Sequence, residues 1–388
     1  MTKRISLLID YPIYEKAKYS GLTFPQIIYD YLKKDKRFNI YSSNDKNIET
    51  LDAVVIFSAG GHLSKKSNFA LIFDNQNIIN IVYSRAKKFI YFFSFFVSLH
   101  KIGFYHRHYF GNKVYLNRIK LLQKKYPKIK IIHRLDNSYQ FVCKNYGYDK
   151  TIKEINKSAD LTIHQSKFSI KLWSGKLKNI FNRQEIINSS NSVLINNGVD
   201  RNLFNPKGNR FNLAGKWKIL HVSASSNPNK GLINVIEMAE IFKRNPAFQF
   251  YLIGDQINDP ICGSDIKYYE NIHYLGKIAD RKKIAKYFRS SNIFFYPSIN
   301  DCSPNVILEA LASGLPVITV DSGGNKELVF KEGTNAGCLF NKQNPALSLK
   351  TIVENYSYFK KNALKMAKTH YDMNNNLKKY ADQICDLF

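Results

Sequence analysis

Two acidic residues flanking a helix-start pattern form the stretch of this sequence best suited to chemistry. Asp301 is followed by Cys-Ser-Pro-Asn, and Glu309 comes eight positions after Asp301. Ser303 suits an N-cap and Pro304 suits the first helical position, so the pattern predicts a helix that runs to Ala312. The first N–H groups of a helix lack partners within the helix and attract anions. The pattern therefore indicates a phosphate-bearing ligand at the helix start, with a carboxylate near each of its ends.

A short apolar strand and a glycine turn follow this helix. Residues 316–320 read Pro-Val-Ile-Thr-Val, and the turn after them contains Gly323 and Gly324. Because glycine has no side chain, such a turn can bring its backbone close to a ligand. Acids, helix start and glycine turn together indicate a site for a sugar nucleotide, in which a diphosphate joins two groups rich in hydroxyls.

This stretch resembles the C-terminal signature of retaining glycosyltransferases with the two-domain GT-B fold, in particular the large family numbered four, the glycosyl transferases group 1. The family has an acid, seven residues and then Glu, and Asp301 stands where Glu is usual. The resemblance implies that Glu309 binds the donor ribose and that Asp301 contacts the transferred sugar as a catalytic residue. Gly323 and Gly324 are implied in sugar binding. The residues implied at the diphosphate are Ser303, Pro304 and Asn305.

A second phosphate-binding stretch is implied at residues 221–231, which read His-Val-Ser-Ala-Ser-Ser-Asn-Pro-Asn-Lys-Gly. The resemblance places Lys230 on the diphosphate. The family commonly has Arg six positions earlier, where this chain has Ala224. Ser225 and Asn227 are therefore expected to supply neutral hydrogen bonds instead. Backbone near Ile278 is implied at the edge of the base.

The acceptor side is expected in the N-terminal half. Residues 130–139 are similar to a subgroup of the family in which a strand ends in an Arg-Leu-Asp turn. The resemblance implies that Asp136 and His133 lie near the reacting sugar as catalytic residues. Asp136 also fits an Asx turn, and His133 also fits a strand-end histidine bonded to backbone. Gly21 matches the first-loop glycine that lets the N-terminal domain approach the donor phosphates.

Apolar strands alternate with amphipathic helices along the chain, which predicts an α/β fold with two Rossmann-like, doubly wound parallel sheets. The expected divisions are an acceptor domain at 1–205, a donor domain at 206–365 and a last helix at 366–388 that returns to the first domain. Ligands of such sheets bind beyond the carboxyl ends of the strands, so the predicted site is a cleft between the two domains. The expected strands are 4–10, 52–57, one that ends at residue 133, 161–163, 217–223, 248–253, 272–275, 293–296 and 316–320.

The formal net charge of +28 is concentrated in one region. Residues 75–135 contain no Asp or Glu but many Lys and Arg, and residues 89–99 form an aromatic run too short to span a bilayer. Cations flanking aromatic residues favour an anionic membrane surface. A buried element with a solvated lysine face is the alternative. Nucleic acid is not an expected partner, because no helix-turn-helix, zinc-finger or RNA-recognition signature occurs.

Cysteine usage and the first residues bear on compartment and cofactors. The five cysteines are widely spread without metal-ligand spacing, and no Asp-x-Asp triplet occurs, so neither a metal nor another cofactor is expected. Residues 1–10 read as a strand rather than a signal peptide. The expected location is the cytoplasm, with peripheral attachment to a membrane.

Three classes of function fit these observations. The first is a hexosyltransferase that moves a sugar from a nucleotide-sugar donor to a lipid-linked or surface glycan acceptor, with the retention of configuration that the resemblance implies. The second is a sugar-nucleotide epimerase, or a glycogen-phosphorylase-like enzyme, on the same architecture, although neither acid/base groups for C2 chemistry nor a pyridoxal lysine are evident. The third is a non-catalytic protein that binds polyanions.

Overall fold

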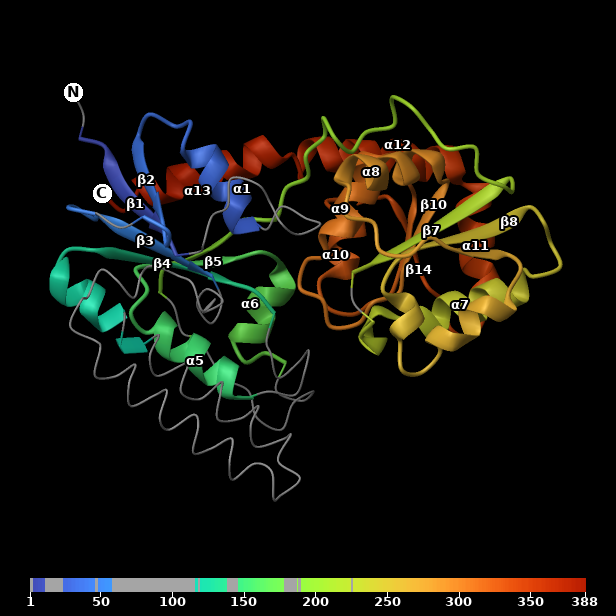
Figure 1. The fold of residues 1–388 in the computed structure, drawn as a ribbon, viewed down its shortest axis with the longest axis horizontal. Helices are drawn as coiled ribbons and strands as arrows, with labels where there is room; N and C mark the ends of the chain where they lie inside the picture. The colour runs from blue at the N-terminus through green and yellow to red at the C-terminus, as the bar shows by residue number, and fades with distance from the viewer. Residues whose placement is uncertain are drawn as a thin grey trace, which may run out of the picture.

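The chain forms two parallel sheets, each of six strands (Figure 1). The structure is a computed structural model that describes residues 3–10, 24–45, 48–57, 116–117, 119–137, 146–177, 187, 190–224 and 226–388. Strand order is β2-β1-β3-β4-β5-β6 in the first sheet and β14-β11-β10-β7-β8-β9 in the second. Order and direction are those of doubly wound sheets, which confirms the predicted fold class.

The first sheet carries helices on both faces. Its strands are β1 (Ile5–Ile9), β2 (Phe38–Ser42), β3 (Ala53–Phe57), β4 (Lys130–Leu135), β5 (Leu161–His164) and β6 (Ser192–Leu194). Its described helices are α1 (Phe24–Leu32), α5 (Tyr146–Asn156) and α6 (Lys167–Trp173). Side chains alternate along a strand, so Ile132 packs in the cluster with α1 whereas Ile131 packs in the cluster with Ile155 of α5. The sequence patterns missed β2 and β6.

The second sheet is built from β7 (Trp217–Ser223), β8 (Phe248–Gly254), β9 (Ile272–Tyr274), β10 (Ile293–Tyr296), β11 (Val317–Thr319) and β14 (Gly337–Leu339). A small antiparallel pair, β12 (Phe330–Lys331) and β13 (Thr334–Asn335), lies between β11 and β14 in the chain. One face packs against α8 (Arg281–Ser290), α9 (Asn305–Ala312) and α12 (Tyr356–Thr369). The other face packs against α7 (Leu232–Ile241) and α11 (Pro345–Glu354). The first four strands and β11 were expected within one or two residues.

The chain passes between the domains twice, and the two passages pair with each other. Val199 donates its N–H to the carbonyl of Tyr371 at 2.8 Å, and Met373 donates to the carbonyl of Val199 at 3.2 Å. A Cβ at Gly198 would lie 2.4 Å from the Cα of Met373, so only glycine permits this approach. The second passage leads to α13 (Met373–Cys385), whose buried Leu377 and Ile384 pack in the core of the first domain.

None of the helices in the described part of the chain is both long and apolar enough to cross a membrane. The aromatic run 89–99 and most of the basic region 75–135 lie outside the described residues.

Candidate active site

A cation, a carboxylate and a phenol meet at the carboxyl edge of the second sheet. Lys230 Nζ lies 2.9 Å from Asp301 Oδ2 and 3.2 Å from the hydroxyl of Tyr296. The Tyr296 hydroxyl donates to Asp301 Oδ2 at 3.3 Å. Burial disfavours the charge on Lys230, but Tyr296 and Asp301 outweigh that effect and raise the pKa of the ammonium. The lysine is therefore a fixed cation with a third N–H donor for a further anion.

Local structure on both sides of Lys230 fixes its position. Lys230 ends the 3₁₀ helix η3 (Pro228–Lys230), which Asn227 caps by accepting the N–H of Asn229 at 2.9 Å. Gly231 then has a φ of 76°, and a Cβ there would lie 2.4 Å from the carbonyl oxygen of Pro297. The turn after β7 thus packs directly on the segment that follows β10. Asn227 acts as a cap in the structure, and its contact with phosphate stays a prediction.

Gly323 and Gly324 pack against the loop that contains Asp301. A Cβ on Gly323 would lie 2.2 Å from the carbonyl oxygen of Asp301, and one on Gly324 would lie 1.9 Å from that of Cys302. The N–H of Gly324 donates to the Asp301 carbonyl at 2.8 Å. The structure therefore gives this turn a role that the sequence did not indicate, which is to hold the backbone of Asp301. The expected sugar contact of the two glycines stays a prediction.

The helix start expected at Ser303 lies one residue later. Helix α9 begins at Asn305 with Pro304 as its N-cap, and this cap offers no side-chain hydrogen bond. Ser303 is not the capping residue: its hydroxyl oxygen is buried and makes no hydrogen bond within the described part of the chain. Proline fixes its own φ, which here suits the position before the helix as well as the first helical position. The N–H groups of the first turn of α9 thus receive no side-chain cap and suit an anion.

Glu309 is buried inside α9 and pairs with Arg281, the first residue of α8. Arg281 Nη2 lies 2.5 Å from Glu309 Oε1, whereas Glu309 Oε2 is buried and has no hydrogen-bond partner among the residues that the structure describes. Burial raises the pKa of Glu309, although Arg281 partly opposes this effect. The guanidinium also lies over the ring of Phe204 at 4.8 Å. One carboxylate oxygen therefore remains to accept a hydrogen bond from a ligand.

The acceptor-side carboxylate of Asp136 is held by a buried cation. Arg134 Nη1 donates to Asp136 Oδ1, which also accepts a hydrogen bond from Gln165 Nε2 at 3.2 Å. Arg134 is only 3% exposed and donates in addition to Gln165, Asn197 and the hydroxyl of Tyr380. The side chain of Asp136 remains 40% exposed. Asp136 is thus oriented by its partners and still accessible.

His133 is in the interior of the first domain. It is fully buried in β4, and its Nδ1 lies 3.1 Å from Asn156 Nδ2 of α5. Alternation along β4 directs His133 toward α5 and Arg134 toward Tyr380 of α13. The expected place of His133 beside the reacting sugar stays a prediction. Its contact with the amide of Asn156 is compatible with the alternative of a buried histidine whose ring nitrogens are hydrogen-bonded.

Direct hydrogen bonds connect the two domains at the start of α9. Asn137 Oδ1 accepts the N–H of Cys302 at 2.8 Å. Asn197 Nδ2 donates to Asn305 Oδ1 at 2.9 Å, and Asn197 Oδ1 accepts a hydrogen bond from Arg134 Nη2 at 2.7 Å. The polar side chains of the first domain therefore run from Asp136 through Arg134 to the first residue of α9. This network unites the acceptor-side and donor-side candidates at one domain boundary.

A second contact between the domains is made by Glu327 of α10 (Asn325–Val329). Its two carboxylate oxygens each lie 2.9 Å from a backbone N–H at the start of α6, those of Lys167 and Phe168. A carboxylate at a helix N-terminus is stabilised by the helix dipole and by the unpaired N–H groups. Glu327 thus fixes α6 against the donor domain.

The remaining candidates divide into described and undescribed residues. Ile278 is half-buried and packs against the core of the second domain, four residues after the end of β9 and three before the start of α8. Its expected contact with the base stays a prediction. Gly21 and Ser225 lie outside the described residues.

Sequence reasoning missed Tyr296 and Arg281, which contact the two candidate acids. Tyr296 ends an apolar strand and reads as a core residue, and Arg281 reads as one of several exposed cations at the start of α8. Asn137 and Asn197 were seen only within motifs, although they link the domains. The one signal of these contacts in the sequence was Arg134, a charged residue within the otherwise mostly apolar strand 130–135.

Known proteins are similar to parts of this sequence. Residues 216–356 match the family profile described as glycosyl transferases group 1. A UDP-Gal:alpha-D-GlcNAc-diphosphoundecaprenol alpha-1,3-galactosyltransferase of Escherichia coli is 31% identical over 156 residues, which is 36% of this chain and 39% of that protein. The chain matches less than two fifths of the length of its first curated relatives.

Solved structures match along the whole chain. Sucrose-phosphate synthase from Thermosynechococcus elongatus has a TM-score of 0.63 at 15% identity, with 100% of this chain and 99% of that chain covered. Anabaena Alr3699/HepE in complex with UDP-glucose has a TM-score of 0.60 at 15% identity, with 99% and 100% covered. The fold of the chain is accordingly the two-domain GT-B fold, and residues 216–356 are similar to the glycosyl transferases group 1 family.

Proposed function

We propose that this protein is a hexosyltransferase that transfers a sugar from a nucleotide-sugar donor to a lipid-linked or surface glycan acceptor. The observation that carries the proposal is the contact of Lys230 with Asp301 at the start of α9, the helix that also contains Glu309. The matched domain and the galactosyltransferase relative support a nucleotide donor and a lipid-linked acceptor. The similar Anabaena structure, which contains UDP-glucose, supports UDP as the nucleotide.

The donor site is proposed to stabilise the leaving diphosphate. When the bond from the anomeric carbon to the diphosphate breaks, negative charge builds on the β-phosphate oxygen. Lys230 offers its third N–H, and the first turn of α9 offers backbone N–H groups, so both favour this charge in the transition state. We infer that these groups suffice without a divalent ion, which chelation with EDTA would test directly.

The two acids are proposed to hold the sugars on either side of the diphosphate. Glu309 Oε2, buried and without a partner, would accept a hydrogen bond from a ribose hydroxyl. Asp301 Oδ2 is already bonded to Lys230 and Tyr296, so Oδ1 is the oxygen available to a hydroxyl of the transferred sugar. Asp301 would thereby couple the position of the transferred sugar to the cation on the diphosphate.

The acceptor is proposed to approach from the first domain, beside Asp136. Arg134 and Gln165 orient this carboxylate, whose side chain is partly exposed. Retention of configuration and membership of family four remain inferences from the signature around Asp301 and Glu309. Attachment to an anionic membrane surface is inferred from the charge of residues 75–135, and it suits an acceptor linked to a lipid.

A donor screen tests the proposal. The protein is incubated with UDP-, GDP- and CDP-sugars and with lipid-extract acceptors, and products are read by mass spectrometry. Release of nucleoside diphosphate together with a glycosylated acceptor is expected. Interconversion of sugar nucleotides without release would instead identify an epimerase. Binding without turnover of any donor would leave a polyanion-binding protein, and the transferase proposal would be wrong.

A further inference from the structure

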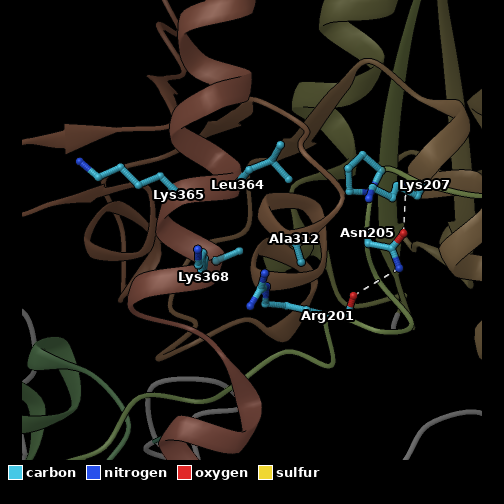
Figure 2. A pocket seen from close by; sticks show the side chains of 9 residues that line it. Arg201, Asn205, Lys207, Ala312, Leu364, Lys365 and Lys368 are labelled. Atoms are coloured by element: carbon cyan, nitrogen blue, oxygen red, sulfur yellow. Dashed lines mark hydrogen bonds between the residues drawn. The ribbon is translucent and has the colours of Figure 1, made fainter.

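A cavity of about 460 Å³ lies on the C-terminal domain, at the end of α9 that is remote from Lys230. Its walls come from the segment after the first interdomain passage, from the last residue of α9 and from α12 (Figure 2). The eight residues of α9 separate this cavity from the helix start by about 12 Å. It is therefore distinct from the donor site proposed above.

Four cations line this cavity: Arg201, Lys207, Lys365 and Lys368. All four residues are exposed. In the described part of the chain, only Arg201 among them forms an ion pair, with Asp372 at 3.0 Å. The lysines thus bring an uncompensated positive charge to one concave surface, which attracts anions.

The floor of the cavity is apolar and closely packed. Ala312 and Ala367 are buried, and Leu364 of α12 also lines the cavity (Figure 2). The side chains of Ala312 on α9 and Ala367 on α12 are small, so they leave space at the surface between these helices. A cationic rim above an apolar floor suits a ligand that has an anionic group next to an apolar one.

The loop that carries two of the cations is already ordered by its own hydrogen bonds. Asn205 Nδ2 donates to the carbonyls of Arg201 at 3.2 Å and of Asn202 at 2.8 Å. Asn205 Oδ1 accepts the N–H of Lys207 at 3.0 Å (Figure 2). A loop fixed before binding loses less conformational entropy when a ligand arrives. This rigidity favours a built binding site over a chance gathering of mobile side chains.

We propose that the cavity binds a phosphate group. The lysines provide point charges for a phosphate, and Arg201, whose Nη1 pairs with Asp372, can donate its remaining N–H groups. The phosphate would come either from the headgroup of an anionic lipid, whose chain begins at the apolar floor, or from a soluble phosphate compound. The alternative is that these cations interact with the carbonyl groups at the C-terminal end of α9, which requires no ligand.

Lysine acylation read by mass spectrometry tests this site residue by residue in the intact protein. The rates at Lys207, Lys365 and Lys368 are measured alone, with inorganic pyrophosphate, with phosphatidic acid vesicles and with phosphatidylcholine vesicles. Lys342 and Lys350, exposed on another part of the same domain, serve as controls. Slower acylation of the cavity lysines, with unchanged controls, is expected. Protection by phosphatidic acid identifies a lipid source, and protection by pyrophosphate alone identifies a soluble one.

Paired variants give the second measurement. In the double variant Lys365→Gln with Lys368→Gln, about 30-fold more of the same phosphate probe should be needed to protect Lys207. Each basic group near an anionic surface contributes roughly fivefold in affinity, and this variant removes two. Lys342→Gln with Lys350→Gln removes the same charge elsewhere and should leave the protection unchanged. Equal loss in both variants, or no protection of cavity lysines by any probe, overturns the proposal. Neither variant alters the donor site, so donor turnover reports independently on the proposed function.

Discussion

Replacing Glu309 by glutamine tests the donor site most directly. The carboxylate has one oxygen bonded to Arg281 at 2.5 Å and one buried oxygen without a partner. A glutamine has nearly the same volume but no charge and a single acceptor oxygen, so when that oxygen accepts from Arg281, its NH₂ group replaces the charged acceptor that faces the ribose hydroxyl. The substitution therefore removes one hydrogen bond to a charged acceptor.

The size of the effect follows from that single lost bond. A hydrogen bond to a charged group is worth about 1.5–3 kcal/mol, which corresponds to roughly 10- to 150-fold in kcat/KM for the donor. Alanine removes the whole carboxylate, and we expect a loss of roughly 10²- to 10⁴-fold if two such bonds are lost. Because burial raises the pKa of Glu309, its charge is unfavourable to folding, and Glu309→Gln should not lower the free energy of unfolding.

The assay compares release of nucleoside diphosphate over a range of donor concentrations with urea unfolding of the same samples. Glu354→Gln, at a side chain 57% exposed on α11, is the matched control and should change neither quantity. An unchanged kcat/KM in Glu309→Gln would refute the assignment of Glu309 to the donor. A loss of activity that tracks a loss of unfolding free energy would show that the residue acts on the fold instead.

Four further outcomes are expected. Gly323 has a φ of 63° and no room for a Cβ, so Gly323→Ala should lower the free energy of unfolding by about 2–4 kcal/mol. Gly333 has a φ of 72° but open space around it, so Gly333→Ala should lower the same quantity by only about 1 kcal/mol. Equal losses in urea unfolding would contradict the contact with Asp301. Burial lowers the pKa of His164 and of His221 to about 4, so the unfolded chain binds more protons than the folded chain below pH 6.5. Acidification from pH 7 to 5 should therefore lower the free energy of unfolding by about 2 kcal/mol for each histidine. A free energy of unfolding that stays constant over this range would argue against buried neutral rings. Glu327→Gln should raise the amide hydrogen exchange of α6, because the helix start loses its charged acceptor. Treatment with EDTA should leave donor turnover unchanged, and restoration of a lost activity by Mg²⁺ would exclude the metal-free mechanism.

The overall architecture could be predicted because it rests on patterns local to each element. Buried parallel strands such as 293–296 are apolar throughout and stand out against their surroundings. Strand β2 was missed because Asn39 and Ser42 interrupt its apolar run, and β6 because it has only three residues. The start of α9 was predicted one residue early, since serine and proline each suit two adjacent positions of a helix start.

The candidate site was predictable only where a motif carries it. Lys230 and Asp301 are 71 residues apart, and the family resemblance rather than spacing placed both at one site, although it did not predict their direct contact. Tyr296 and Arg281 could not be found, because their roles depend on which side chain of another element they meet. The place of His133 was assigned from its motif alone, whereas its burial and its contact with Asn156 depend on the alternation of side chains along β4 and on α5.

The pairing of the two interdomain passages has a consequence for biosynthesis. Helix α13 supplies Leu377, Tyr380 and Ile384 to the core of the domain that begins with β1. A ribosome delivers that helix only after the whole second sheet has been made. Until then part of the apolar surface of the first domain is uncovered, so chaperone binding to nascent chains should persist until residues 373–385 emerge from the ribosome.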